Sequence, residues 1–143
     1  MNMNFFETIY HWFQSIYGRD LYDFLAGYDG SDYVARNYFI PIGVVSLLIA
    51  VIFMVVYYYV INSSKLNKWW HWLFVLLLSG VVALFVGYGW THRLLPDVPE
   101  SLVVYNSDCW LFGLANFIYV AGWFIIISFC FKWWSSGCRR TPF

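Results

Sequence analysis

Two segments of the sequence combine cationic side chains with tryptophan. Residues 63–72 read Ser-Ser-Lys-Leu-Asn-Lys-Trp-Trp-His-Trp, and residues 132–140 read Lys-Trp-Trp-Ser-Ser-Gly-Cys-Arg-Arg. Cations beside indole rings hold nucleotides or single-stranded nucleic acid by charge and stacking. The same composition is typical of anchoring at the lipid headgroup level. The sequence therefore predicts an anchoring surface, with a ligand surface as the alternative. Its residues are Lys65, Lys68, Trp69, Trp70, Trp72, Lys132, Arg139 and Arg140.

Residues suited to catalysis or metal binding are scattered along the chain. His11 and His92 are isolated from each other in sequence, and the three cysteines lack the spacing of a metal site. No serine or cysteine has a base nearby in sequence. We therefore expect no enzymatic activity and no cofactor.

Three apolar runs connect the polar segments of the chain and must position their side chains. They cover residues 39–61, 73–90 and 111–131, and none contains Asp, Glu, Lys, Arg or His. A bilayer core about 30 Å thick needs roughly 20 apolar residues of helix, because a helix satisfies its own backbone hydrogen bonds in lipid. The chain is 62% hydrophobic and 24% aromatic, more than a soluble domain of 143 residues can bury. The runs predict an all-α protein with three transmembrane helices in a single membrane domain, residues 1–143.

The charges flanking the runs alternate in sign. Acidic residues dominate segments 1–38 and 91–110, whereas segments 62–72 and 132–143 contain only cations as formal charges. Lys and Arg of short loops accumulate on the cytoplasmic side. The sequence predicts an N-terminus outside, a C-terminus inside, and a multi-pass location in the cell (inner) membrane. Aromatic belts are expected at both headgroup levels.

Residues 5–25 carry a bulky aromatic stripe at helical spacing. Phe5, Ile9, Trp12, Phe13 and Ile16 share this stripe, with polar residues on the other sides. The segment predicts one amphipathic helix that lies in the outer interface or packs on the bundle.

Small residues form a stripe on the second span. Ser79, Ala83 and Gly87 are spaced by four, so they share one helix face. Such faces let helices approach closely in lipid, either within one chain or between the subunits of a homo-oligomer. Asn116 is the most polar side chain well inside a span, and it needs a partner there. An interhelical hydrogen bond is the simpler interpretation, and pore lining is the alternative.

Val86, Gly87, Tyr88 and Gly89 have the order Val-Gly-Tyr-Gly. This order resembles the core of the potassium-channel filter, whose carbonyl oxygens replace the hydration shell of the ion. The resemblance implies a pore helix at 73–85 between two spans, 39–61 and 111–131. It covers only four residues, Phe85 stands where the filter has Thr, and it places the basic loop outside.

Three spans enclose little space, so function is expected to require several copies or a larger partner. The first hypothesis is a homo-oligomeric ion channel or pore-type effector in the lipid bilayer. An anionic, nucleotide or single-stranded nucleic-acid ligand would gate it at the basic face. The second hypothesis is a non-conducting accessory or scaffold subunit of a larger membrane complex. A potassium-channel-like filter is a further alternative.

Overall fold

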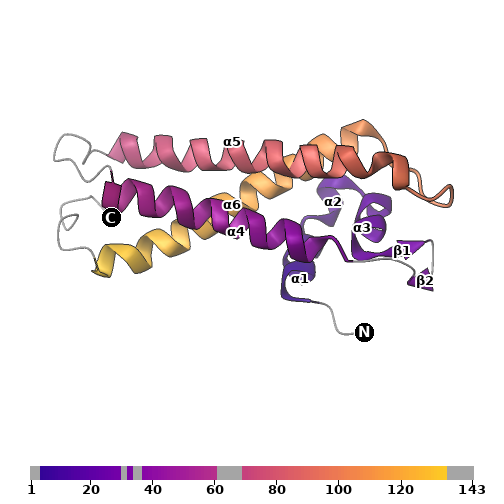
Figure 1. The fold of residues 1–143 in the computed structure, drawn as a ribbon, viewed down its shortest axis with the longest axis horizontal. Helices are drawn as coiled ribbons and strands as arrows, with labels where there is room; N and C mark the ends of the chain where they lie inside the picture. Colours follow the sequence, from indigo (N-terminus) through magenta and orange to yellow (C-terminus); the bar gives the residue numbers. More distant parts are fainter. Residues whose placement is uncertain (1–3, 30–31, 34–36, 61–68, 135–143) are drawn as a thin grey trace.

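Three long helices form the body of the protein in this computed structural model, which describes residues 4–29, 32–33, 37–60 and 69–134 (Figure 1). They are α4 (Phe39–Val55), α5 (Trp69–Leu94) and α6 (Asn106–Trp134). Three segments are long and apolar enough to cross a membrane: Phe39–Tyr59, Trp69–Asp97 and Asn106–Phe131. α4 and α6 run in one direction and α5 in the opposite direction. The prediction of three membrane-length helices is confirmed.

Two of the helices extend beyond the apolar runs. α4 continues into a π-helical turn, η1 (Val56–Val60), which still lies within the run 39–61. In contrast, α5 starts at Trp69 and reaches the 3-10 turn η3 (Leu95–Asp97), and α6 exceeds the run 111–131 at both ends. Pro96 lies in η3, where the α-helical hydrogen-bond pattern stops. Residues at the headgroup level can continue a helix because their backbone groups still make helical hydrogen bonds. Their side chains are too polar for the apolar core, so they do not belong to the apolar runs.

The N-terminal segment folds as three short helices and not as one. They are α1 (Phe5–Trp12), α2 (Gln14–Tyr17) and α3 (Arg19–Ala26). The prediction of a continuous helix over 5–25 is therefore wrong. Gly18 separates α2 from α3 with a φ of 90°, a conformation that few other residues adopt. The chain can therefore turn at this point and fold its aromatic residues onto the bundle.

A short hairpin connects these helices to the first span. Gly27, with a φ of 95°, ends α3 in the left-handed conformation that favours glycine. β1 (Tyr28–Asp29) then pairs antiparallel with β2 (Asp32–Tyr33). The amide of Tyr38 also donates to the carbonyl of Leu25, at 2.8 Å. The start of α4 is thereby held against the end of α3.

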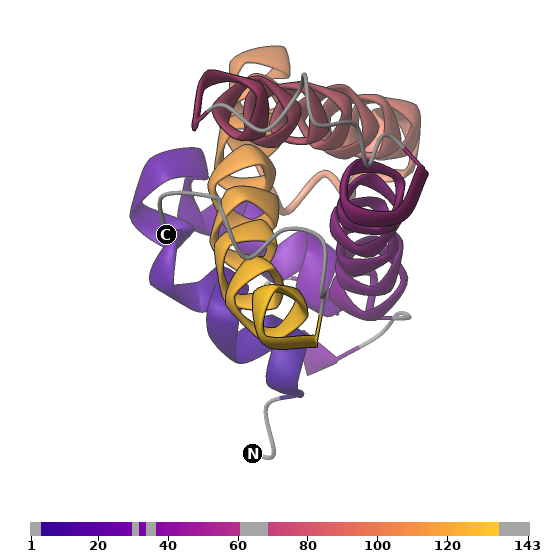
Figure 2. The same cartoon turned by 90° about the vertical axis from the view of Figure 1, so that its left-hand side faces the viewer.

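Glycines allow α5 and α6 to approach closely. A Cβ added at Gly113 of α6 would lie 2.8 Å from the carbonyl oxygen of Leu84, and one added at Gly80 of α5 would lie 2.5 Å from the ring of Phe117. Figure 2 views the bundle along its length and shows α4, α5 and α6 at the corners of a triangle, with the N-terminal helices beside α6. Close backbone approach of this kind strengthens packing in lipid, where dispersion contacts drive association.

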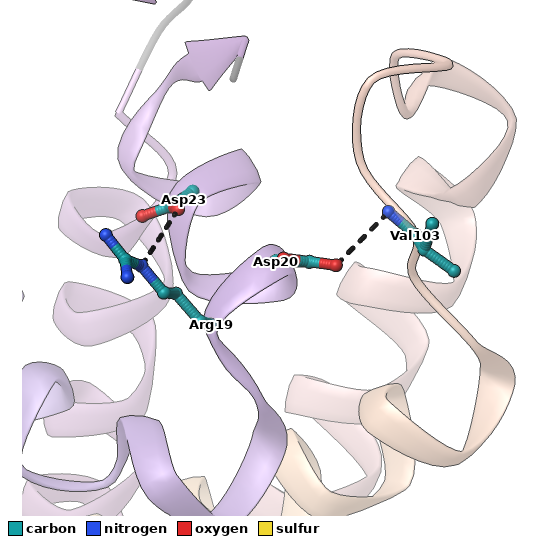
Figure 3. Close-up of polar contacts among 4 residues, drawn as sticks. All are labelled: Arg19, Asp20, Asp23 and Val103. Carbon is teal, nitrogen blue, oxygen red and sulfur yellow. Dashed lines mark hydrogen bonds and ion pairs between the residues drawn. The ribbon is translucent and has the colours of Figure 1, made fainter. Parts of the chain in front are cut away.

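The segment after α5 is joined to the N-terminal helices. The amide of Val103 donates to Asp20 Oδ2 at 3.4 Å, and Arg19 pairs with Asp23 at 3.7 Å on the same helix (Figure 3). Burial raises the pKa of the Asp23 carboxyl, and Arg19 opposes that rise. The two segments predicted to share one side of the membrane thus lie at the same end of the bundle.

Candidate functional site: a buried polar cluster

The serine and asparagine side chains within the three apolar runs all face the interior. The runs contain four serine and asparagine residues, and each is buried. They are Ser46 on α4, Ser79 on α5, and Asn116 and Ser128 on α6. Apolar lipid offers no hydrogen-bond partners, so polar groups in spans are directed toward one another.

Asn116 is the centre of a cluster that joins three long helices and α1. Its Nδ2 donates to the carbonyl oxygen of Ala83 at 2.8 Å. Its Oδ1 accepts from the hydroxyls of Tyr10, at 2.6 Å, and Ser46, at 2.9 Å. The side chain is fully buried. The prediction that Asn116 makes an interhelical hydrogen bond is confirmed, and the cluster includes more elements than expected.

Tyr10 inserts from α1 into the bundle between aromatic rings. Its ring stacks against Phe39, Phe112 and Tyr119 at centroid distances of 5.2, 5.5 and 5.1 Å. Tyr17 lies behind it and donates its hydroxyl to the Tyr10 carbonyl at 2.9 Å. Burial raises the pKa of the Tyr10 phenol, and the nearby Tyr119 adds to the rise. The phenol therefore acts as a neutral hydrogen-bond donor, and it anchors the N-terminal helices.

The small-residue stripe is used within one chain. Ser79, Ala83 and Gly87 are all buried, and Ser79 donates to the carbonyl of Leu76 at 2.8 Å. A Cβ added at Gly87 would lie 3.1 Å from both Cβ and Nδ2 of Asn116. Gly87 thus provides the space that Asn116 occupies. In this fold the stripe is a packing surface between α5 and α6, so it does not present a contact face to another subunit.

A second polar cluster lies toward the other end of the bundle. Ser128 on α6 shares a 2.8 Å hydrogen bond with Tyr58 and accepts from Trp72 Nε1 at 3.0 Å. The sequence predicts aromatic belts at the headgroup levels, yet near this end of the bundle Tyr58 is buried and the indole of Trp72 points to α6. Sequence reasoning missed the hydrogen-bonding roles of Tyr10, Ser46, Tyr58 and Ser128, because hydrogen-bond partners 70 or more residues apart leave no local pattern.

The four filter-like residues are helical. Val86 to Gly89 lie within the uninterrupted helix α5, where carbonyl oxygens point along the axis to amides one turn later. A filter instead directs successive carbonyls into a shared pore. The expected pore helix at 73–85 is the middle of the same helix. The structure therefore contradicts the filter architecture.

Only part of the predicted basic face belongs to the described residues. Trp69 and Trp70 are exposed at the start of α5, and their rings lie 4.8 Å apart. Trp72 makes the inward hydrogen bond to Ser128. Lys65, Lys68, Arg139, Arg140 and the side chain of Lys132 lie outside the described residues.

A buried carboxylate lies in α1. Glu7 is 6% exposed, and it accepts hydrogen bonds from Asn37 Nδ2 at 3.0 Å and from the Tyr22 hydroxyl at 3.4 Å. It also caps its own helix through the Asn4 amide at 3.4 Å. These contacts connect α1, α3 and the start of α4, which gives Glu7 a structural role in the N-terminal fold.

Within ranges 4–29, 32–33, 37–60 and 69–134, no group of three or more His, Cys, Asp and Glu side chains could hold a metal ion. Comparison with protein-family models, curated proteins and solved structures finds no match to this chain.

Proposed function

We propose that this chain is a non-conducting accessory subunit that binds and positions other proteins within a membrane. The observation that carries the proposal is the direction of the polar side chains. The four serine and asparagine residues of the apolar runs all face inward and have hydrogen-bond partners within the same chain. In the part of the apolar runs that the structure describes, copies of this fold would have no exposed serine or asparagine with which to line a water-filled pathway.

The outward faces of the spans support this proposal. The exposed side chains of α4 and the start of η1 from Ile40 to Val56, of α5 from Phe74 to Phe85, and of α6 from Leu111 to Phe129 are all aliphatic or phenyl. Such faces suit lipid and the apolar flanks of partner helices equally. A catalytic or transport role would instead place ionisable groups along a cavity.

The end of the bundle that carries α1–α3 is the proposed outer face. Segments 1–38 and 91–110, in which acidic residues dominate, are joined there by the hydrogen bond from the Val103 amide to Asp20, and the cationic segments follow the opposite ends of the helices in sequence. The positive-inside rule then gives an N-terminus outside and a multi-pass location in the cell (inner) membrane.

Native mass and ion flux together test the proposal. The isolated chain in mild detergent should be a monomer, and liposomes that contain it should pass neither potassium nor chloride, with or without added nucleotide on either side. A symmetric ring that conducts ions would overturn the proposal and establish the homo-oligomeric channel or pore-type effector instead.

Photo-crosslinking in the native membrane tests the partner. Benzoylphenylalanine at Leu48, Phe74 or Ile125 samples one exposed face on each span. A discrete protein adduct from one of these faces, together with none from the buried control position Ala50, is the expected result. Lipid adducts alone from all three faces would refute an accessory role.

A further inference from the structure

A groove of about 450 Å³ lies along α5 near its C-terminal end. Its lining consists of Phe85, Val86, Gly89, Trp90, Arg93 and Leu94. These residues follow one another at spacings of one, three and four, so they occupy one side of the helix. Gly89 opens the groove, since a Cβ added there would meet no atom within 4 Å.

Arg93 lies at the end of this groove with its side chain exposed. In the part of the chain that the structure describes, Arg19 has Asp23 as its ion-pair partner, whereas Arg93 has no ion pair or hydrogen-bond partner. Asp97 and Glu100, which follow Arg93, are exposed and weaken the attraction of anions to this end. The combination is an apolar groove on a membrane-length helix with a free guanidinium at its polar end.

We propose that this groove binds one glycerophospholipid, with its phosphate on Arg93 and one acyl chain along Gly89. A guanidinium favours phosphate because its planar fork matches the phosphate oxygens and loses hydration readily. Phe85 and Trp90 flank the acyl chain. The phosphate then lies where α5 leaves the apolar core, which is the headgroup level.

The composition of the groove favours a phospholipid over a protein helix. It runs along about 12 Å of α5, the helical rise from Phe85 to Arg93. Its apolar lining suits an acyl chain, and the phosphate of the same molecule supplies the anion that Arg93 lacks. The apolar side of a partner helix would leave this guanidinium without a partner.

Native mass spectrometry of the full chain tests this proposal. The detergent-solubilised protein is titrated with phosphatidylglycerol, and with diacylglycerol of the same acyl chains, which lacks the phosphate. We expect one phosphatidylglycerol to be retained per chain and diacylglycerol to be bound about fivefold more weakly. A fivefold difference in affinity is the upper end of what one exposed ion pair contributes. Arg93→Gln should reduce phosphatidylglycerol binding to that level, and Arg93→Lys should restore part of it.

A pair of glycine variants separates groove binding from general lipid adhesion. Gly89→Leu fills the groove and should abolish the single retained lipid. Gly122→Leu is the matched control, because a Cβ at Gly122 of α6 also meets no atom within 4 Å. It should leave binding unchanged, and far-UV circular dichroism should show equal helix content in both variants. Equal lipid retention by the two glycine variants, or by Arg93→Gln and the unmodified chain, would overturn the proposal.

Discussion

Replacing Asn116 by leucine should remove the polar centre of the bundle while keeping the number and branching of the side chain's heavy atoms. Asn116 makes hydrogen bonds to Tyr10, Ser46 and the carbonyl of Ala83, and the leucine makes none of them. The carbonyl of Ala83 already accepts a hydrogen bond within its own helix, so losing the one from Asn116 costs it little. The hydroxyls of Tyr10 and Ser46 are fully buried and lose their acceptor.

The size of the effect follows from these contacts. Hydrogen bonds within membrane bundles contribute about 0.6 kcal/mol on average, so three of them give about 2 kcal/mol. A buried donor without an acceptor costs a further 1–3 kcal/mol or so. Serine can turn to a carbonyl of its own helix, so that penalty falls mainly on Tyr10, which is stacked between rings. We expect Asn116→Leu to lower the free energy of unfolding by about 3–5 kcal/mol.

The assay is equilibrium unfolding in mixed micelles. Sodium dodecyl sulfate is titrated into the protein in a mild detergent, and far-UV circular dichroism reports the loss of helix. The free energies of unfolding of the unmodified chain, of Asn116→Leu, and of Tyr10→Phe are compared. Tyr10→Phe should cost about 1 kcal/mol, because one hydrogen bond is lost and the carboxamide oxygen keeps its contact with Ser46.

The double variant Tyr10→Phe with Asn116→Leu is the control for the mechanism. Removing both partners of a buried hydrogen bond is less harmful than removing one, so the double variant should be more stable than the sum of the single effects predicts, by at least about 0.5 kcal/mol. A loss below about 0.5 kcal/mol for Asn116→Leu, or additive effects in the double variant, would show that the cluster does not hold α1 to the spans.

Three other outcomes follow from the same contacts. Gly87→Ala should destabilise the bundle by about 1 kcal/mol or more, because its Cβ meets Asn116, whereas Gly122→Ala should not; thermal unfolding compares the pair. Gly43→Ala should displace α1, because the new methyl group overlaps the ring of Phe6, and limited proteolysis of the N-terminal segment should accelerate. Burial raises the pKa of Tyr10 and of two other tyrosines of α1–α3. The free energy of unfolding should therefore fall as pH rises above about 10. The unfolded chain then loses phenol protons that the folded chain retains, so ultraviolet absorbance of phenolate should rise together with unfolding; titration of all tyrosines before unfolding would contradict this.

The sequence alone determined that the chain has three helices of membrane length. Their apolar runs are uninterrupted by charge, and a helix is the structure that satisfies its backbone without a neighbour, so this inference needs no knowledge of tertiary contacts. The need of Asn116 for a partner followed from the same reasoning, because amide groups are poorly solvated in lipid. Helix ends were less predictable, since the helices continue past the apolar boundary into residues such as Trp69 and Arg93.

Tertiary structure decided which helices and side chains these residues pack against. The stripe of Ser79, Ala83 and Gly87 is equally suited to a neighbouring span or to another subunit, and only the fold directs it to α6. The helical spacing of residues 5–25 permitted either an interfacial helix or packing on the bundle, and only the fold shows that Tyr10 of α1 enters the bundle. Val-Gly-Tyr-Gly is helical because the surrounding apolar residues continue the hydrogen-bond pattern of α5. In each case local sequence permits several partners, and long-range packing selects one.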